Sequence, residues 1–308
     1  MSETAKSFVL CPGQGAQAVG MGKAWFDKYP VAAQTFAAAD AELGIELSKL
    51  CFEGPAEELN RTDIAQAAIY TTSVACYQAL METEAIAPIG FTAGLSLGEF
   101  TALHLAGAYD FLDGLRLVRL RGQAMQEAAD ASESSMVAIT GDANEEAINE
   151  LCDKARGDGI LVPANFNSTM QVVVSGSLDA CERAVKVANE MGLKPTPLTV
   201  AGAFHSPIMA PAADKLAAAL DKVEWETPKV PVLSNVTGKL HDNENIASIK
   251  KLLVAQLTSP VRWSQSMQWA ATNTDMQMVE VAPGKVLTGL MKRIDRKRKV
   301  QNHANPAE

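Results

Sequence analysis

At Gly94-Leu95-Ser96-Leu97-Gly98-Glu99, the chain places a serine in a G-x-S-x-G pattern between an expected strand and an expected helix. A short, fairly apolar run over residues 89–93 precedes the pattern, and a good helix-forming sequence over residues 100–106 follows it. Glycines remove the Cβ atoms that would clash in such a tight turn, so the serine hydroxyl can point outward. The pattern therefore predicts Ser96 as a nucleophile.

The amide of Leu97 is expected in the first turn of that helix. N–H groups there have no helical acceptor and can stabilise a negatively charged oxygen. The alternative is a chance occurrence of the pattern, in which a serine merely caps a helix after a glycine-rich turn. The catalytic interpretation requires a general base close to Ser96.

The chain has four histidines from which that base can come. His303 lies in a polar tail and His241 in a polar loop, so neither is the expected base. His104 follows Ser96 on the same helix, too far along the axis to reach back. His205, directly before a helix, is therefore the candidate, with a loop histidine that only packs or caps as the alternative. Either a carboxylate or a backbone carbonyl could orient its other ring nitrogen.

Arg121 lies on the apolar face of the helix expected from Asp110 to about Ala129, given the rotation of about 100° per residue. A guanidinium on that face needs a partner, because an unpaired buried charge is costly. An internal salt bridge and a substrate carboxylate held by two hydrogen bonds are both compatible with this position. Helical geometry alone does not favour either partner over the other.

The order of the expected elements predicts an α/β fold with two parts. Strands and helices alternate through the first part of the chain, which indicates a parallel sheet. The following segment has the order β-α-β-β-α-β, typical of a ferredoxin-like module, and α/β patterning then resumes, with further strands expected at 231–234 and 277–281. We therefore expect a large α/β-hydrolase-like domain with a parallel sheet core (residues 1–131 and 201–308) and an inserted ferredoxin-like subdomain (residues 132–200).

Composition excludes several classes of function. The net charge of −9 disfavours nucleic-acid binding. No stretch approaches the roughly 18 continuous apolar residues of a membrane span, so no membrane partner is expected. The five cysteines are odd in number and scattered without C-x-x-C spacing, which argues against a disulfide framework and against a zinc site. We therefore expect a cytoplasmic protein without a metal.

Together, these segments resemble the malonyl-CoA:acyl carrier protein transacylases and, more loosely, the acyltransferase domains of fatty acid and polyketide synthases. The similarity spans nearly the whole chain. The matching motifs, in chain order, lie at residues 12–17, 94–99, 120–126, 203–206, 256–263 and 280–287. Two positions depart from the family pattern: Leu95 stands where a histidine usually precedes the serine, and Ala282 stands in a stretch that often reads G-P-G.

The resemblance implies a catalytic role for each matched position. Ser96 would be the nucleophile and His205 its base. The backbone amides of Gln14 and Leu97 would form the oxyanion hole. The backbone carbonyl of Gln256 would orient His205, which makes a dyad supported by the main chain rather than a triad with a carboxylate.

The resemblance also implies a substrate and a partner. Arg121 would hold the malonyl carboxylate while the acyl group passes from malonyl-CoA, through Ser96, to the phosphopantetheine thiol of acyl carrier protein. No cofactor is implied, and the product could serve fatty acid or polyketide synthesis. A serine thioesterase or esterase is the alternative, which predicts an acid in the triad and no need for Arg121. A non-catalytic module that binds carrier protein is disfavoured, because Ser96 and His205 are both present.

Overall fold

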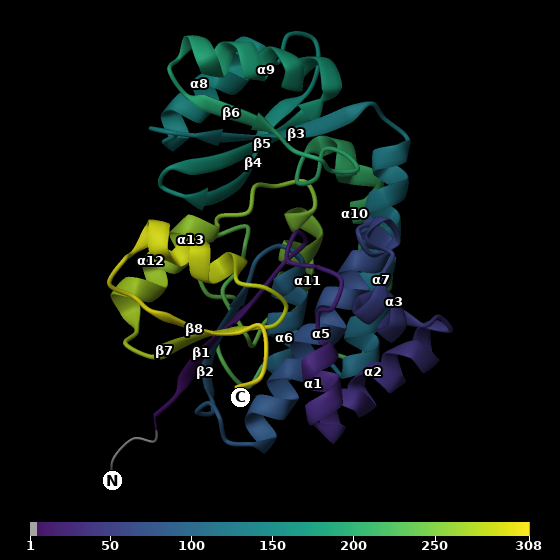
Figure 1. Cartoon of the computed structure of the whole chain (residues 1–308). Helices are drawn as coiled ribbons and strands as arrows, with labels where there is room; N and C mark the ends of the chain where they lie inside the picture. Colours follow the sequence, from purple (N-terminus) through teal and green to yellow (C-terminus); the bar gives the residue numbers. More distant parts are fainter. Residues whose placement is uncertain (1–4, 308) are drawn as a thin grey trace.

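A parallel sheet organises the larger part of the chain in the computed structural model, which describes residues 5–307 (Figure 1). Its strands are, in spatial order, β2 (Ile89–Gly94), β1 (Ser7–Cys11), β7 (Gln277–Val281) and β8 (Val300–His303). Cys11 pairs with Gly94, so the carboxyl ends of β1 and β2 lie together. These ends are where parallel α/β sheets usually bind ligands. The strands predicted near residues 7–11, 89–93 and 277–281 are confirmed.

Both faces of this sheet are covered, because alternate residues of β1 enter two different cores. Val9 and Cys11 pack with the helices of one face: α1 (Lys23–Lys28), α2 (Pro30–Leu43), α3 (Leu47–Glu53), α4 (Ala56–Leu59), α5 (Thr62–Glu82), α6 (Leu97–Leu105), α7 (Phe111–Asp130), α10 (Ala210–Leu220) and α11 (Ile246–Gln256). Phe8 and Leu10 pack with α12 (Trp263–Asn273) and α13 (Val286–Ile294) on the other. A short 3-10 helix, η1 (Pro207–Met209), precedes α10.

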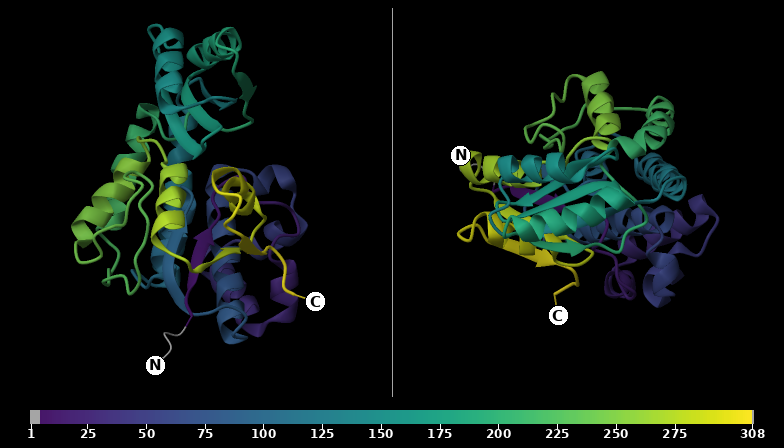
Figure 2. Two further views of the ribbon diagram at one scale, coloured as in Figure 1. Left: turned by 90° about the vertical axis from the view of Figure 1, so that its left-hand side faces the viewer. Right: turned by 90° about the horizontal axis from the view of Figure 1, so that it is seen from above.

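The inserted segment forms a second, antiparallel sheet with a core of its own. Its elements are β3 (Ser134–Thr140), α8 (Glu145–Ala155), β4 (Leu161–Ser168), β5 (Gln171–Ser177), α9 (Leu178–Glu190) and β6 (Lys194–Pro197). The spatial order β4-β5-β3-β6 is that of a ferredoxin-like module, as predicted. Figures 1 and 2 show this unit at one end of the molecule, with α8 and α9 on the side away from the parallel sheet.

The inserted unit is joined to the rest of the protein through main-chain hydrogen bonds. Phe166 N–H donates to the Val261 carbonyl at 2.9 Å, and Val261 N–H donates to the Ala164 carbonyl at 2.8 Å. The edge of β4 is thereby tied to the segment that leads into α12. The limits at residues 132 and 200 stay a prediction, and the predicted ranges also include residues 1–4 and 308, which lie outside the described part of the chain.

Two predictions about local structure were wrong. Residues 231–234 form isolated bridges from Val232 to Thr92 and from Leu233 to Leu240 rather than a strand, and Pro231 lacks the N–H that a longer ladder would use. His303 is not in a polar tail, because residues 300–303 form β8 and His303 is buried against the neighbouring elements. The polar sequence of residues 300–303 does not indicate a strand, because these residues join the sheet through main-chain pairing with β7.

Glu280, a buried residue of β7, connects the sheet to α13. Its carboxylate accepts hydrogen bonds from the N–H groups of Leu287 at 2.7 Å and Thr288 at 2.8 Å, in the first turn of the helix. It also accepts one from Asn302 Nδ2 at 3.2 Å, which ties in the edge strand β8. One carboxylate thus satisfies helix N–H groups that have no helical acceptor.

We expect Glu280→Ala to lower the free energy of unfolding by about 1–3 kcal/mol, because it leaves buried N–H donors without an acceptor. Urea unfolding followed by circular dichroism measures the change. Glu224→Ala, at an exposed carboxylate, is the control and should change stability by less than about 0.5 kcal/mol. Equal stability of the two variants would show that Glu280 does not hold α13.

Candidate active site

Ser96 lies in the turn between β2 and α6, with its backbone at φ 52° and ψ −106°. A positive φ is uncommon for a non-glycine residue, and such a conformation costs about 1–3 kcal/mol. Close packing enforces it: a Cβ on Gly98 would lie 2.1 Å from the Cys11 carbonyl oxygen. The Leu95 N–H also donates to that carbonyl at 3.1 Å. The turn is therefore fixed to the end of β1.

Asn235 holds the same turn from the other side. Its Oδ1 accepts a hydrogen bond from the Ser96 N–H at 2.6 Å, and its Nδ2 donates to the Gly94 carbonyl at 2.7 Å. The side-chain amide thus satisfies main-chain groups that the turn removes from the sheet ladder. Sequence reasoning missed Asn235, because no motif marks it and its contacts are 139 and 141 residues away along the chain.

Ser96 and His205 meet as the sequence predicted. Ser96 Oγ lies 2.8 Å from His205 Nε2, and His205 Nδ1 lies 2.7 Å from the Gln256 carbonyl oxygen. A carbonyl only accepts hydrogen bonds, so this contact places the imidazole proton on Nδ1 and leaves Nε2 to receive the serine proton. The partner of Nδ1 is therefore a backbone carbonyl. His205 itself has φ 58°, a second strained position at the site.

The surroundings of His205 keep its ring neutral. Burial, and after it the positive charge of Arg121, lowers the pKa of His205 to about 4, whereas the hydrogen bond to the Gln256 carbonyl opposes the shift. At neutral pH the imidazole is therefore unprotonated. That is the state a general base needs in order to accept a proton from Ser96.

Arg121 projects from α7 to the same serine and is only 1% exposed. Its Nη1 donates to Gln66 Oε1 at 2.8 Å, and its Nη2 donates to Gln256 Oε1 at 2.8 Å and to Ser96 Oγ at 3.1 Å. Burial lowers its pKa to about 9, with the charge of Glu99 opposing, so the guanidinium remains protonated at neutral pH. Within residues 5–307 it forms no salt bridge.

The two candidate oxyanion donors lie on turns that pack against each other. Leu97 is the first residue of α6, and Gln14 lies in the turn after β1. A Cβ on Gly13 would lie 2.2 Å from the Leu95 carbonyl oxygen, so only glycine allows this approach. Neither the Gln14 N–H nor the Leu97 N–H donates a hydrogen bond to another described residue. Both amides are therefore free to bind a negatively charged oxygen.

Leu95 occupies the position where the family pattern usually has histidine. Its half-buried side chain packs with the apolar cluster that includes Trp263 and Met267 of α12. The departure therefore adds to a hydrophobic contact on the other face of the sheet. Ser96 keeps its contact with His205 alongside it.

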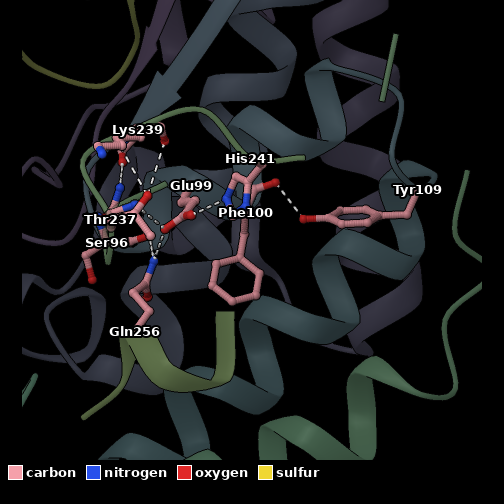
Figure 3. A network of polar contacts seen from close by, with 10 residues as sticks. Ser96, Glu99, Phe100, Tyr109, Thr237, Lys239, His241 and Gln256 are labelled. Atoms are coloured by element: carbon pink, nitrogen blue, oxygen red, sulfur yellow. Dashed lines mark hydrogen bonds and ion pairs between the residues drawn. The ribbon is translucent and has the colours of Figure 1, made fainter. Parts of the chain in front are cut away.

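His241 lies in a loop, as predicted, but its side chain is buried. Its N–H donates to the Val232 carbonyl at 2.8 Å, which ties the loop to the segment beside β2. His241 Nε2 lies 2.7 Å from Oε1 of Glu99 (Figure 3). Sequence reasoning assigned no role to Glu99, although it ends the motif that begins at Gly94. Its 142-residue separation from His241 leaves no local signal.

The part of the chain that the structure describes contains neither a metal-binding cluster nor a helix that could span a membrane. Among residues 5–307, no group of three or more histidine, cysteine, aspartate or glutamate side chains is arranged to hold a metal ion. No helix among these residues combines the length and the apolar character that crossing a membrane requires. All five cysteines are buried and free.

Comparison with known proteins identifies a family and several relatives. The acyl transferase domain family matches residues 8–305. A malonyl CoA-acyl carrier protein transacylase of Escherichia coli (strain K12) is 44% identical over 284 residues, which cover 92% of this chain and 91% of that protein. A solved malonyl-CoA:acyl carrier protein transacylase of Xanthomonas oryzae pv. oryzae has a TM-score of 0.93 at 40% identity, covering 99% of this chain and 96% of the other. A malonyl-transacylase solved in complex with its type II PKS acyl-carrier protein has a TM-score of 0.93 at 39% identity, covering 98% and 97%.

The low pKa of His205 predicts the pH dependence of Ser96 reactivity. The base acts only when neutral, so the rate falls as the pH falls through its pKa of about 4. In Arg121→Met one cause of the lowered pKa is absent, so the rate should begin to fall at a higher pH. The measurement is inactivation by phenylmethylsulfonyl fluoride, an uncharged serine reagent, with circular dichroism confirming folding at each pH.

Arg119→Met, on the same helix but paired with Asp63, is the matched control and should keep the wild-type profile. Identical acid limbs in Arg121→Met and wild type would show that Arg121 does not act on His205.

Proposed function

The chain belongs to the acyl transferase domain family, and from this premise we propose that it transfers a malonyl group from malonyl-CoA to the phosphopantetheine thiol of an acyl carrier protein. The observation that carries the proposal is Arg121, a buried guanidinium beside Ser96 Oγ whose hydrogen-bond partners are neutral. A malonyl group ends in a carboxylate, which supplies the missing opposite charge. Guanidinium and carboxylate also match in shape, so they can form two parallel hydrogen bonds.

In the first half-reaction the malonyl group moves to Ser96. His205 Nε2 takes the proton of Ser96 Oγ, and the oxygen attacks the thioester carbonyl carbon. The Gln14 and Leu97 amides hold the negative charge that develops on the carbonyl oxygen. When the C–S bond breaks, coenzyme A leaves as the thiol with the proton from His205, and the malonyl group remains as an ester of Ser96.

The second half-reaction reverses these roles with a new thiol. His205 takes the proton of the phosphopantetheine thiol, and the sulfur attacks the malonyl ester carbonyl. The C–O bond to Ser96 breaks, and the serine oxygen recovers the proton from His205. The order is ping-pong, because coenzyme A leaves before the carrier protein thiol reacts. The complex of a related malonyl-transacylase with its acyl-carrier protein supports carrier protein as the acceptor.

A serine thioesterase or esterase fits the site less well. Such an enzyme predicts a carboxylate at the outer nitrogen of the base, whereas His205 Nδ1 contacts the Gln256 carbonyl. It also has no use for a buried positive charge beside Ser96. We further propose a cytoplasmic location, which the free, buried cysteines support, since disulfides are rare in a reducing compartment. The product would enter fatty acid or polyketide synthesis.

We expect Ser96→Ala to abolish the covalent intermediate. Wild-type protein mixed with malonyl-CoA should gain the mass of one malonyl group, and the variant should gain none, because among residues 5–307 no other hydroxyl is hydrogen-bonded to the His205 ring. Intact-protein mass spectrometry measures both. Ser206→Ala, next to the base but bonded to the Ala203 carbonyl, is the control that should still be labelled. An equal adduct on Ser96→Ala would contradict the assignment.

We expect Arg121→Met to separate malonyl from acetyl transfer. Losing one partner of a shielded guanidinium–carboxylate pair costs about 2–5 kcal/mol, so kcat/KM for malonyl-CoA should fall roughly 10²-fold or more. Acetyl-CoA lacks the carboxylate, so its kcat/KM should stay the same or rise. Steady-state transfer to carrier protein measures both donors. Equal losses for the two donors would mean that Arg121 is structural.

A further inference from the structure

Glu99 lies in the first turn of α6, directly behind the nucleophile, and is only 1% exposed (Figure 3). Its Oε1 is 2.7 Å from His241 Nε2, and its Oε2 accepts hydrogen bonds from Gln256 Nε2 at 2.6 Å and from the Asn235 N–H at 3.3 Å. With the His241 proton on Nε2, all three partners donate. An ionised carboxylate, which only accepts, satisfies them together. The reaction steps described above do not use this carboxylate.

Gln256 connects Glu99 to Ser96, His205 and Arg121. Its Nε2 donates both to Glu99 and, at 3.0 Å, to the Ser96 carbonyl, while its Oε1 accepts from Arg121 Nη2. Its own backbone carbonyl accepts from His205 Nδ1. An amide that donates to a carboxylate at one end presents its oxygen at the other. The bond to Glu99 therefore decides which end of the Gln256 amide faces Arg121.

The carboxylate of Glu99 affects Arg121 electrostatically, although the two side chains are not in direct contact. Glu99 raises the pKa of Arg121 against the larger effect of burial, yet the two side chains form no salt bridge. A direct ion pair would neutralise the guanidinium, whereas Gln256 accepts from it with a neutral amide oxygen. With Gln256 between them, the negative charge offsets part of the cost of burying the guanidinium, while Arg121 keeps its hydrogen bond to Ser96 Oγ.

We propose that Glu99, held by His241, is a positioning residue for acyl-group selection, which fixes the Gln256 amide so that Arg121 is aimed at the carboxylate of the substrate. The inference rests on the proposed function, because it assigns Glu99 to the selectivity of that transfer. A role confined to folding would require only that Glu99 fill its site. A positioning role requires that its loss change the preference between charged and uncharged acyl donors.

The test is Glu99→Gln, which keeps the size and removes the charge. We expect kcat/KM for malonyl-CoA to fall about tenfold, mainly through a higher KM, because a hydrogen bond to a charged group is weakened. Acetyl-CoA should change by less than about threefold. Glu280→Gln is the matched control, a similarly buried carboxylate of the sheet, and should lower the melting temperature without changing the ratio of the two donors.

Gln256→Met provides a second test that does not depend on how well Glu99→Gln folds. It removes the side-chain amide and keeps the backbone carbonyl that His205 uses. We expect the same loss of malonyl preference, and no further loss when it is combined with Glu99→Gln, because the two residues act in series.

Two results would overturn the inference alone: an unchanged malonyl-to-acetyl ratio in Glu99→Gln, or losses in the two variants that simply add. A wild type that does not prefer malonyl-CoA would instead contradict the proposed function, and the inference with it.

Discussion

The backbone of Ser96 is the constraint on which the site depends. Its positive φ brings the serine hydroxyl out of the turn, and it persists only because the neighbouring elements leave no room for another arrangement. The Cys11 carbonyl at the end of β1 lies where a side chain at position 98 would be, and Asn235 binds the main chain on both sides of the turn. The parallel pairing of β1 and β2, together with close packing at the turn, therefore fixes the position of the nucleophile.

A backbone carbonyl, rather than a carboxylate, orients His205. The Gln256 carbonyl holds the ring by geometry but carries no negative charge with which to stabilise an imidazolium, whereas a triad carboxylate would do both. Burial, and after it the charge of Arg121, lowers the pKa of His205, and the contact with the Gln256 carbonyl opposes this only in part, so the ring is a weak base. A thioester needs less from its base than an amide does, because a thiolate is a better leaving group than an amine. The main-chain contact is sufficient for such a substrate.

Sequence reasoning succeeded where the signal is local. The residues next to Ser96 in the sequence predict its turn, and helical rotation predicts the face on which Arg121 lies. His205 is identified by excluding the other three histidines. Glu99, Asn235 and His241 meet only after distant segments fold together, so no spacing along the chain could show their contacts. Gln14 and Gln256 were assigned from family resemblance alone. Each was assigned for a backbone group, which every residue type has, so the side chain in the sequence gives no sign of the role.

The remaining question is why a positive charge is buried next to a base that must accept a proton. The other arginines of α7, Arg116 and Arg119, form ion pairs with carboxylates, so the helix does not lack acidic neighbours. Arg121 instead hydrogen-bonds the nucleophile and lowers the pKa of His205 while its charge is unpaired. On the proposed function, a bound malonyl carboxylate offsets that charge and removes this part of the lowering. The base then gains strength when the charged acyl donor is in place, so recognition of the substrate and activation of Ser96 depend on the same electrostatic interaction.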